Sequence, residues 1–212
     1  MKIDILTLFP EMFDGPFNES IIKRAQEKGL VKIKVHNLRS WATGKHNTVD
    51  AKPYSGGSGM VLMVEPVYKA LKDLKSKDSK TILLSPQGEK YSQEKAREFS
   101  KAEHLILIAG HYEGFDERIR ENLIDEEVSI GDYVLTGGEI PAMALVDSIV
   151  RLIPKVLGSE ESLEGETHSK RNYKKHPVYT RPEEFNGWRV PEVLLSGDHK
   201  KIEEWEKGKT KS

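Results

Sequence analysis

The chain has 212 residues, 37% of them hydrophobic and 32% charged, which is typical of a folded globular protein and not of a disordered one. It contains no cysteine, so disulfides, cysteine-based zinc sites and a cysteine nucleophile are excluded. No apolar run is long enough to span a membrane, and the N-terminus lacks the features of a signal peptide, so we expect a cytoplasmic protein. The net charge of −1 does not by itself favour a nucleic-acid partner.

Strands and helices alternate from the first residues onward. The apolar run at 3–9 predicts a buried strand that Pro10 ends, and 18–29 predicts a helix that begins at an asparagine cap. The alternating pattern of 31–38 predicts a second strand. A polar, glycine-rich stretch follows from about Ser40 to Gly59, and connections of this length are usually functional or mobile.

The same alternation continues to residue 154. Strands that run into turns are predicted at 80–89, 104–114 and 126–139, and helices at 65–76, 92–101, 116–123 and 140–154. The last of these helices is apolar almost all round, which predicts that it is buried. The chain is therefore predicted to be an α/β protein with a mainly parallel sheet and helices on both faces.

The pattern becomes polar after this helix. We expect one main domain at 1–158, an interdomain linker at 159–180 and a small C-terminal helical segment at 181–212. Basic runs occur at HSKRNYKKH (168–176) and KGKTK (207–211). Such runs are most often solvated surface, so taken alone they favour RNA only weakly.

Three turns follow the apolar strands: LLSPQGE (83–89), IAGHYEG (108–114) and SIGDYVLTGGE (129–139). Ligands of open α/β sheets bind where the strands end, and glycine permits a close approach of the backbone. Each turn alone is more often an ordinary connection, but together they predict a shared pocket. None fits the P-loop or dinucleotide patterns, and neither does YSGGSGM (54–60). Main-chain groups beside tyrosines would suit an adenosine-type ligand.

Six longer motifs stand out along the chain: LTLFPEMF, LLSPQGE, GHYEGFDERI, SIGDYVLTGGEIPAMALVDSIVRLIP, PVYTRP and VPEVLLSGDHKKIEEW. In order and spacing they resemble the bacterial tRNA (guanine-N1)-methyltransferases, the TrmD family of the SPOUT class, from Met1 to about Trp205. The resemblance implies a deep trefoil knot in the sheet, a homodimer whose active site is shared between subunits, and S-adenosylmethionine as cofactor. It also suggests magnesium, and it implies methyl transfer to N1 of guanosine 37 in tRNA.

On this resemblance the three turns bind the cofactor. The residues carried over are Pro86, Gly110, Tyr112, Glu113, Ile130, Gly131, Asp132, Tyr133, Val134, Leu135, Gly137 and Gly138. A side chain at Gly138 is expected to crowd the cofactor or the turn. The early loop is expected to receive the target nucleotide through His46, Asp50 and Tyr54. Two further residues are expected to face RNA, namely Arg181 and His199. The alternative for these polar residues is a solvated position or, for the arginine, a contact with the linker.

Methyl transfer to guanine N1 needs a general base, because that nitrogen is a poor nucleophile until its proton leaves. The resemblance places Glu166 at the position of this base. Charge then builds on O6, and Arg151 is the matching cation. The alternatives are a solvated carboxylate for Glu166 and an i,i+4 ion pair with Asp147 for Arg151.

Some positions depart from the family pattern. Lys155 replaces a family glycine, and the segment before PVYTRP is far more basic than usual. Family members also continue past the position of Ser212 with a basic helical segment, so we expect weaker tRNA binding that the basic linker partly offsets. Two other functions stay open: a related SPOUT enzyme that methylates another RNA position, and an RNA- or cofactor-binding protein with little catalysis.

Overall fold

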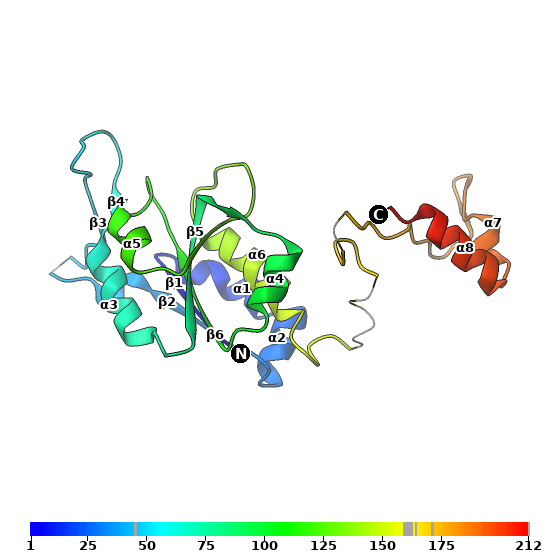
Figure 1. The fold of residues 1–212 in the computed structure, drawn as a ribbon, viewed down its shortest axis with the longest axis horizontal. Coiled ribbons are helices and arrows are strands. Elements are labelled where there is room, and N and C mark those ends of the chain that lie inside the picture. Colours follow the sequence, from blue (N-terminus) through cyan, green and yellow to red (C-terminus); the bar gives the residue numbers. More distant parts are fainter. Residues whose placement is uncertain (45, 159–162, 164, 171, 212) are drawn as a thin grey trace. The chain divides into compact units, whose positions relative to one another are not determined.

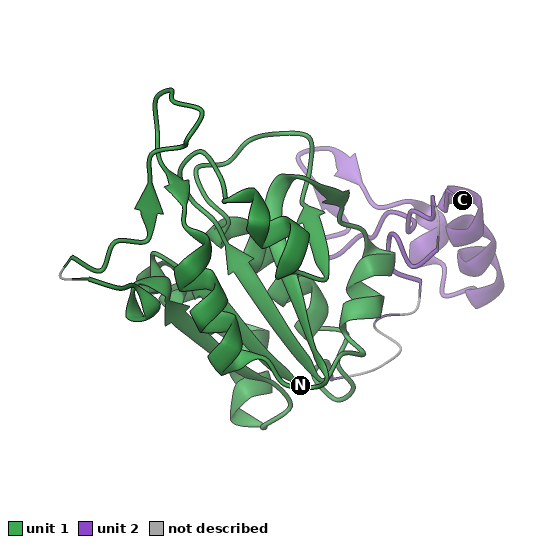
Figure 2. Ribbon diagram, turned by 60° about the vertical axis from the view of Figure 1, so that its left-hand side comes forward, with its two compact units in different colours: residues 1–157 green, residues 158–212 purple. Residues whose placement is uncertain are grey.

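The computed structural model describes residues 1–44, 46–158, 163, 165–170 and 172–211. They form two compact units, Met1–Leu157 and Gly158–Ser212 (Figure 1, Figure 2). The first unit contains a parallel sheet with its helices, and the second contains a small hairpin and two helices. Within the described ranges, no helix is both long enough and apolar enough to cross a membrane.

A five-stranded sheet in the order β2–β1–β6–β5–β7 forms the centre of the first unit, and all its pairings are parallel. The strands are β1 (Lys2–Thr7), β2 (Lys32–Asn37), β5 (Ser79–Lys90), β6 (His104–Ala109) and β7 (Glu126–Ser129). Every residue of β6 is buried, as expected for a strand covered on both faces. Because the strands are parallel, the carboxyl ends of β5, β6 and β7 meet at one edge of the sheet.

Helices cover both faces of this sheet, so the predicted α/β class with a mainly parallel sheet is confirmed (Figure 1). They are α2 (Ser20–Glu27), α3 (Val64–Leu74), α4 (Gln93–Phe99), α5 (Glu117–Asn122) and α6 (Glu139–Val150). Helices α3 and α5 share one hydrophobic cluster with Leu83 and Ile106 of the sheet. Helices α2, α4 and α6 share the other cluster with Ile82 and Leu105. Neighbouring residues of a strand thus face opposite clusters, as the twofold period of a strand requires.

The sequence patterns did not predict the shortest elements. These are η1 (Pro10–Phe13), α1 (Asp14–Phe17), η2 (Leu38–Trp41), β3 (Asp50–Ala51), β4 (Val61–Leu62), β8 (Glu184–Phe185), β9 (Trp188–Arg189) and α7 (Glu192–Leu195). Elements of two to four residues contain too few positions to show a period. Burial of Phe13 and Phe17 in the core explains the helical turns after β1.

Strand β5 is longer than predicted, and it contains a bulge. Both Leu84 and Glu89 pair with Val128 of β7, so the residues between them loop out of the ladder. Gly88 in this loop lies against β7, where a Cβ atom would be 2.6 Å from the carbonyl carbons of Glu127 and Val128. The tight contact explains why a strand continues through a segment that the sequence marks as a turn.

A buried carboxylate joins three strands of the sheet. Asp4 in β1 has no exposed surface, and its oxygens lie 2.6 Å from Nε2 of His36, 2.7 Å from Nε2 of His104 and 2.6 Å from Nζ of Lys2. Burial opposes ionisation of Asp4, but these three partners outweigh burial and hold its pKa well below the ordinary value. The charged form of Asp4 therefore stabilises the fold at neutral pH.

The second unit is held by contacts around its last helix, α8 (His199–Lys209), which lies in the segment predicted to be helical at 181–212. Asp198 caps α8 by accepting a hydrogen bond from the backbone N–H of Lys201 at 3.3 Å. Lys174 and Lys211 exchange two backbone hydrogen bonds, so described residues of the predicted linker lie beside the end of α8. No described side chain of this unit is fully buried.

We predict that Asp4→Asn lowers the free energy of unfolding by about 3 kcal/mol at neutral pH, because its partners lose a buried carboxylate. The folded-state pKa of Asp4 lies below the unfolded one, so its stabilisation is present above about pH 4 and is lost as the pH falls further. Urea unfolding between pH 7 and pH 3 should give a flatter pH dependence for Asp4→Asn than for the wild type. The exposed Asp78→Asn is the control, and wild-type stability of Asp4→Asn would contradict the prediction.

Candidate functional site

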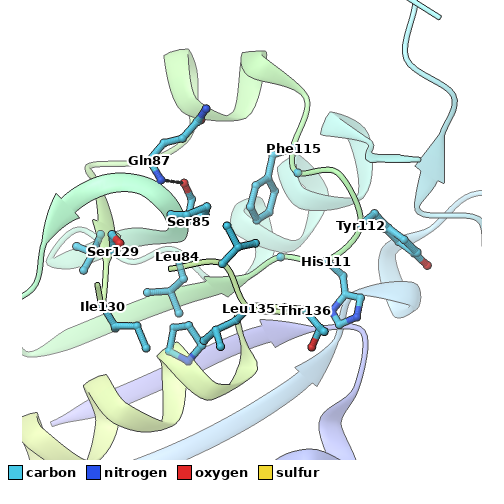
Figure 3. A pocket seen from close by; sticks show the side chains of 18 of the residues that line it. Leu84, Ser85, Gln87, His111, Tyr112, Phe115, Ser129, Ile130, Leu135 and Thr136 are labelled. Carbon is cyan, nitrogen blue, oxygen red and sulfur yellow. Dashed lines mark hydrogen bonds between the residues drawn. The ribbon is translucent and has the colours of Figure 1, made fainter. Parts of the chain in front are cut away.

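A cavity of about 360 Å³ opens where β5, β6 and β7 end (Figure 3). Most of its wall comes from 84–87, 110–115, 128–131 and 133–138, which lie in or next to the three turns that the sequence predicted to share a pocket. The volume falls within the range of roughly 300–1,000 Å³ that is typical of small-molecule sites. The three turns therefore enclose a space of the right size for a small ligand.

All the predicted cofactor residues except Asp132 line this cavity. They are Pro86, Gly110, Tyr112, Glu113, Ile130, Gly131, Tyr133, Val134, Leu135, Gly137 and Gly138. The Asp132 carboxylate is not part of the wall and lies 2.5 Å from Nζ of Lys90. Its neighbour Tyr133 is 55% exposed, so this wall is open to solvent on its outer side.

The cavity has further walls that the sequence did not single out. They are Leu84, Ser85, Gln87, His111, Gly114, Phe115, Arg120, Val128, Ser129, Thr136 and Pro141. Figure 3 shows the Phe115 ring beside the cavity, and it lies so close to Gly110 that a side chain there would overlap the ring. Most of these residues flank a predicted one in the same turn, as expected from the prediction that the three turns share a pocket. Arg120 on α5 has no such signal.

Arg120 places a paired cation in the wall. Its Nε donates to Glu127 at 2.8 Å and its guanidinium also donates to Glu117 at 2.8 Å. Burial opposes the charged form, but the two carboxylates outweigh burial and raise the pKa of Arg120. The positive charge at this wall is therefore fixed in position by protein groups.

The glycine pair at the start of α6 is required by the close approach of two backbone segments. The N–H of Gly138 donates to the carbonyl of Gly110 at 2.7 Å. A Cβ atom on Gly138 would lie 2.7 Å from Cα of Ala109 and 2.8 Å from N of Gly110. The φ angle of Gly138 is −84°, which any residue can adopt, so space and not conformation demands glycine here. The sequence had suggested crowding of the turn or of its ligand, and the structure shows that the end of β6 is the obstacle.

A second buried carboxylate lies behind the glycine pair. Glu139 is only 1% exposed, and its Oε1 accepts a hydrogen bond from the hydroxyl of Thr7 at 2.7 Å. Its Oε2 lies 3.4 Å from Nδ1 of His111 in the cavity wall. The Thr7 hydroxyl in turn accepts a hydrogen bond from the backbone N–H of Phe9 at 2.9 Å. These contacts tie the end of β1, the turn after β6 and the start of α6 together.

The whole chain, residues 1–212, matches the family model described as tRNA (Guanine-1)-methyltransferase TrmD. The chain belongs to this family. A relative from Carboxydothermus hydrogenoformans, named tRNA (guanine-N(1)-)-methyltransferase, is 58% identical over 98% of this chain and 81% of its own length. Relatives of the same name from Staphylococcus carnosus and Bacillus pumilus are 56% and 57% identical, over 97% of this chain and 84% and 85% of their own lengths. The predicted family is therefore confirmed.

The two residues predicted to carry the TrmD chemistry belong to different units. Arg151 is half-buried and follows α6, where its backbone N–H donates to the carbonyl of Asp147 at 3.3 Å. Glu166 belongs to the second unit, in a turn that the backbone N–H of Ser169 closes at 2.9 Å. Each is therefore placed within its own unit, and their joint role stays a prediction.

The predicted RNA contacts of the TrmD family are divided in the same way. In the first unit, His46 and Tyr54 lie exposed in connections on either side of β3, and Asp50 begins β3. In the second unit, Arg181 is exposed and His199 begins α8. All five residues are at least partly exposed to solvent, and their roles stay predictions.

Magnesium has no ligand set among the residues that the structure describes. Within those ranges, no group of three or more histidine, cysteine, aspartate or glutamate side chains could hold a metal ion. We therefore assign no residue and no chemical step to a metal.

We predict that Gly138→Ala lowers the free energy of unfolding by about 1–3 kcal/mol, because the added methyl group would overlap backbone atoms of Ala109 and Gly110. The same displacement should weaken cofactor binding, since Gly110 and Gly138 both line the cavity. Gly15→Ala is the matched control, because nothing lies within 4 Å of a Cβ there. Urea unfolding and calorimetric titration measure the two effects, and a wild-type result for Gly138→Ala would show that the segments can separate at no cost.

We also predict opposite effects for two buried threonines. Thr7→Val removes a donor from the Glu139 carboxylate and should cost about 1–3 kcal/mol. Thr81→Val should be neutral or stabilising, because within the described residues the buried Thr81 hydroxyl has no hydrogen-bond partner. Urea unfolding of both variants tests the difference. If both variants lose the same free energy of unfolding, the hydrogen bond between Thr7 and Glu139 does not contribute measurably to stability.

Proposed function

We propose that this chain transfers a methyl group from S-adenosylmethionine to N1 of guanosine 37 in tRNA. The observation that carries the proposal is the shared cavity: the turns that hold the family motifs line one space at the carboxyl edge of the sheet. The match to the TrmD family over all 212 residues supports the same reaction. The reaction class follows from the family, and the position in the tRNA is the finer part of the proposal.

The cavity suits S-adenosylmethionine by its size and by its donors. Backbone groups around Ile130–Leu135 can hydrogen-bond a nucleoside, and Leu84, Ile130 and Phe115 supply apolar contacts. Gly110 and Gly138 also line the cavity, and each contributes backbone and no side chain to its wall. When bound there, S-adenosylmethionine supplies an electrophilic methyl group on a sulfonium centre.

The protein then has to prepare guanine N1 as the nucleophile. We assign the removal of its proton to the carboxylate of Glu166, which acts as the general base. Arg151 stabilises the negative charge that develops on O6 of the same base. The target base has to leave its stack to reach these groups, and we assign its reception to His46, Asp50 and Tyr54.

The proposed assembly contains two copies of the chain and a tRNA. By family, the sheet is expected to carry a deep trefoil knot, and two copies of the chain are expected to share each active site. Arg181 and His199 are assigned to the tRNA backbone, where an arginine pairs well with phosphate. A tRNA-modifying enzyme with these properties would act in the cytoplasm. Residues 159–180 would form the linker between the main domain and the C-terminal helical segment.

The test of the substrate position uses tRNA transcripts with guanosine or adenosine at position 37. We predict methyl transfer to the first transcript and none to the second, because adenosine offers no N1 proton or O6 to the proposed groups. Transfer that persists with adenosine at position 37 would instead favour a related enzyme with another RNA target. Cofactor binding without any transfer would favour a binding protein.

We predict that Glu166→Gln slows methyl transfer by about 100-fold or more while S-adenosylmethionine still binds, because only the proton acceptor is lost. Arg151→Ala should slow transfer to a similar degree, about 100-fold. Single-turnover transfer and calorimetric titration measure the two steps separately. Glu204→Gln, in exposed α8, is the control for Glu166. Asp147→Asn is the control for Arg151, and a loss as large as that of Arg151→Ala would favour the ion-pair interpretation.

A further inference from the structure

The glycines of YSGGSG (54–59) have no part in the proposed function. They lie in the connection between β3 and β4, which pair in antiparallel fashion through Asp50 with Leu62 and Ala51 with Val61. The run ends next to β4, and β4 lies beside one wall of the cavity. The sequence excluded a P-loop for this run, so its glycines need another explanation.

Three backbone hydrogen bonds join the end of this connection to the turn after β6. Glu113 N–H donates to Met60 at 3.0 Å, Leu62 N–H donates to Gly114 at 3.0 Å, and Asp116 N–H donates to Leu62 at 2.9 Å. Leu62 also forms a parallel bridge with Phe115. The residues directly after the glycine-rich run are therefore hydrogen-bonded to the cavity wall.

Gly59 differs from the other two glycines of the run in the atoms that a Cβ at its position would meet. All three have left-handed backbone, with φ of +76° at Gly56, +105° at Gly57 and +96° at Gly59. A Cβ atom on Gly59 would be 2.9 Å from Oε1 and 3.0 Å from Cδ of Glu113, and closer still to its Cγ. Nothing lies within 4 Å of a Cβ at Gly56 or Gly57. Conformation explains all three glycines, but only Gly59 also leaves room for another side chain.

We propose that Gly59 is a positioning residue for Glu113. The missing side chain lets Glu113 lie over the backbone of the connection, and this contact sets where the carboxylate stands in the cavity wall. The affinity for S-adenosylmethionine would then depend on Gly59 through Glu113. This inference rests on the proposed function, in which Glu113 belongs to the cofactor site.

The first experiment compares Gly59→Ala with Gly57→Ala. Both place an alanine in left-handed backbone, so both bear conformational strain of the same kind. Only Gly59→Ala displaces Glu113, so calorimetric titration should show S-adenosylmethionine binding at least about tenfold weaker in this variant, or about 1.4 kcal/mol. Gly57→Ala should stay within about twofold of the wild type. Equal affinities of the two variants would overturn the proposal.

A double-mutant cycle with Glu113→Ala tests whether Gly59 acts through Glu113. Alanine at position 113 removes the atoms that overlap, so adding Gly59→Ala to it should change the cofactor affinity by no more than about twofold. A further tenfold loss in the double variant would overturn the proposal. Thermal unfolding of the same proteins checks the fold: Glu113→Ala should restore the melting temperature of Gly59→Ala to that of Gly57→Ala.

These outcomes separate the inference from the proposed function. If the wild type binds S-adenosylmethionine but methylates no tRNA, the proposed reaction fails and the cycle can still be read from the affinities. If the wild type methylates guanosine 37 and the cycle is additive, only the positioning role of Gly59 fails. A wild type with no affinity for S-adenosylmethionine would overturn both.

Discussion

The contact on which the site depends is the backbone approach between the end of β6 and the start of α6. Gly138 and Gly110 are joined by a 2.7 Å hydrogen bond, and there is no room for a Cβ atom between the segments. This contact fixes the helix that carries Glu139 behind the cavity and the turn that carries Phe115 beside it. The shape of the cavity is therefore set by main-chain packing, which is less adaptable than side-chain packing.

Two buried carboxylates are held by the same strand, β1, one of them, Asp4, within the sheet and the other, Glu139, next to the cavity. Asp4 and Thr7 of β1 face opposite sides of the sheet, because their separation is an odd number of residues. Asp4 joins β1 to β2 and β6, and Thr7 joins it through Glu139 to α6. Each acid is buried with polar partners, Asp4 with two histidines and a lysine and Glu139 with the Thr7 hydroxyl and the His111 ring. A strand near the middle of the sheet thus fixes both the sheet and the floor of the cavity.

The sequence predicted the parts of this arrangement that depend on a residue's own burial. Periodicity located the main strands and helices, and glycines at strand ends located the cavity walls. Periodicity could not reveal the partner of Glu139, because Thr7 is 132 residues away and both residues look like ordinary polar positions. The bulge in β5 was missed for a related reason: Gly88 and Pro86 resemble a turn, and only contact with β7 keeps the chain extended. Local patterns report which face is buried, and they do not report what lies against it.

The division of the chain has a consequence for the proposed chemistry. The cavity is built into a unit with two extensive cores, whereas Glu166 belongs to a unit whose described side chains are nowhere fully buried. A unit with so little buried surface gains little stability from its own packing. Under the proposed function, contacts with tRNA and with a second copy of the chain would therefore help to place the general base beside the cofactor site. Binding energy of the correct tRNA would then help to assemble the catalytic groups. This use of binding energy is the usual basis of specificity by induced fit.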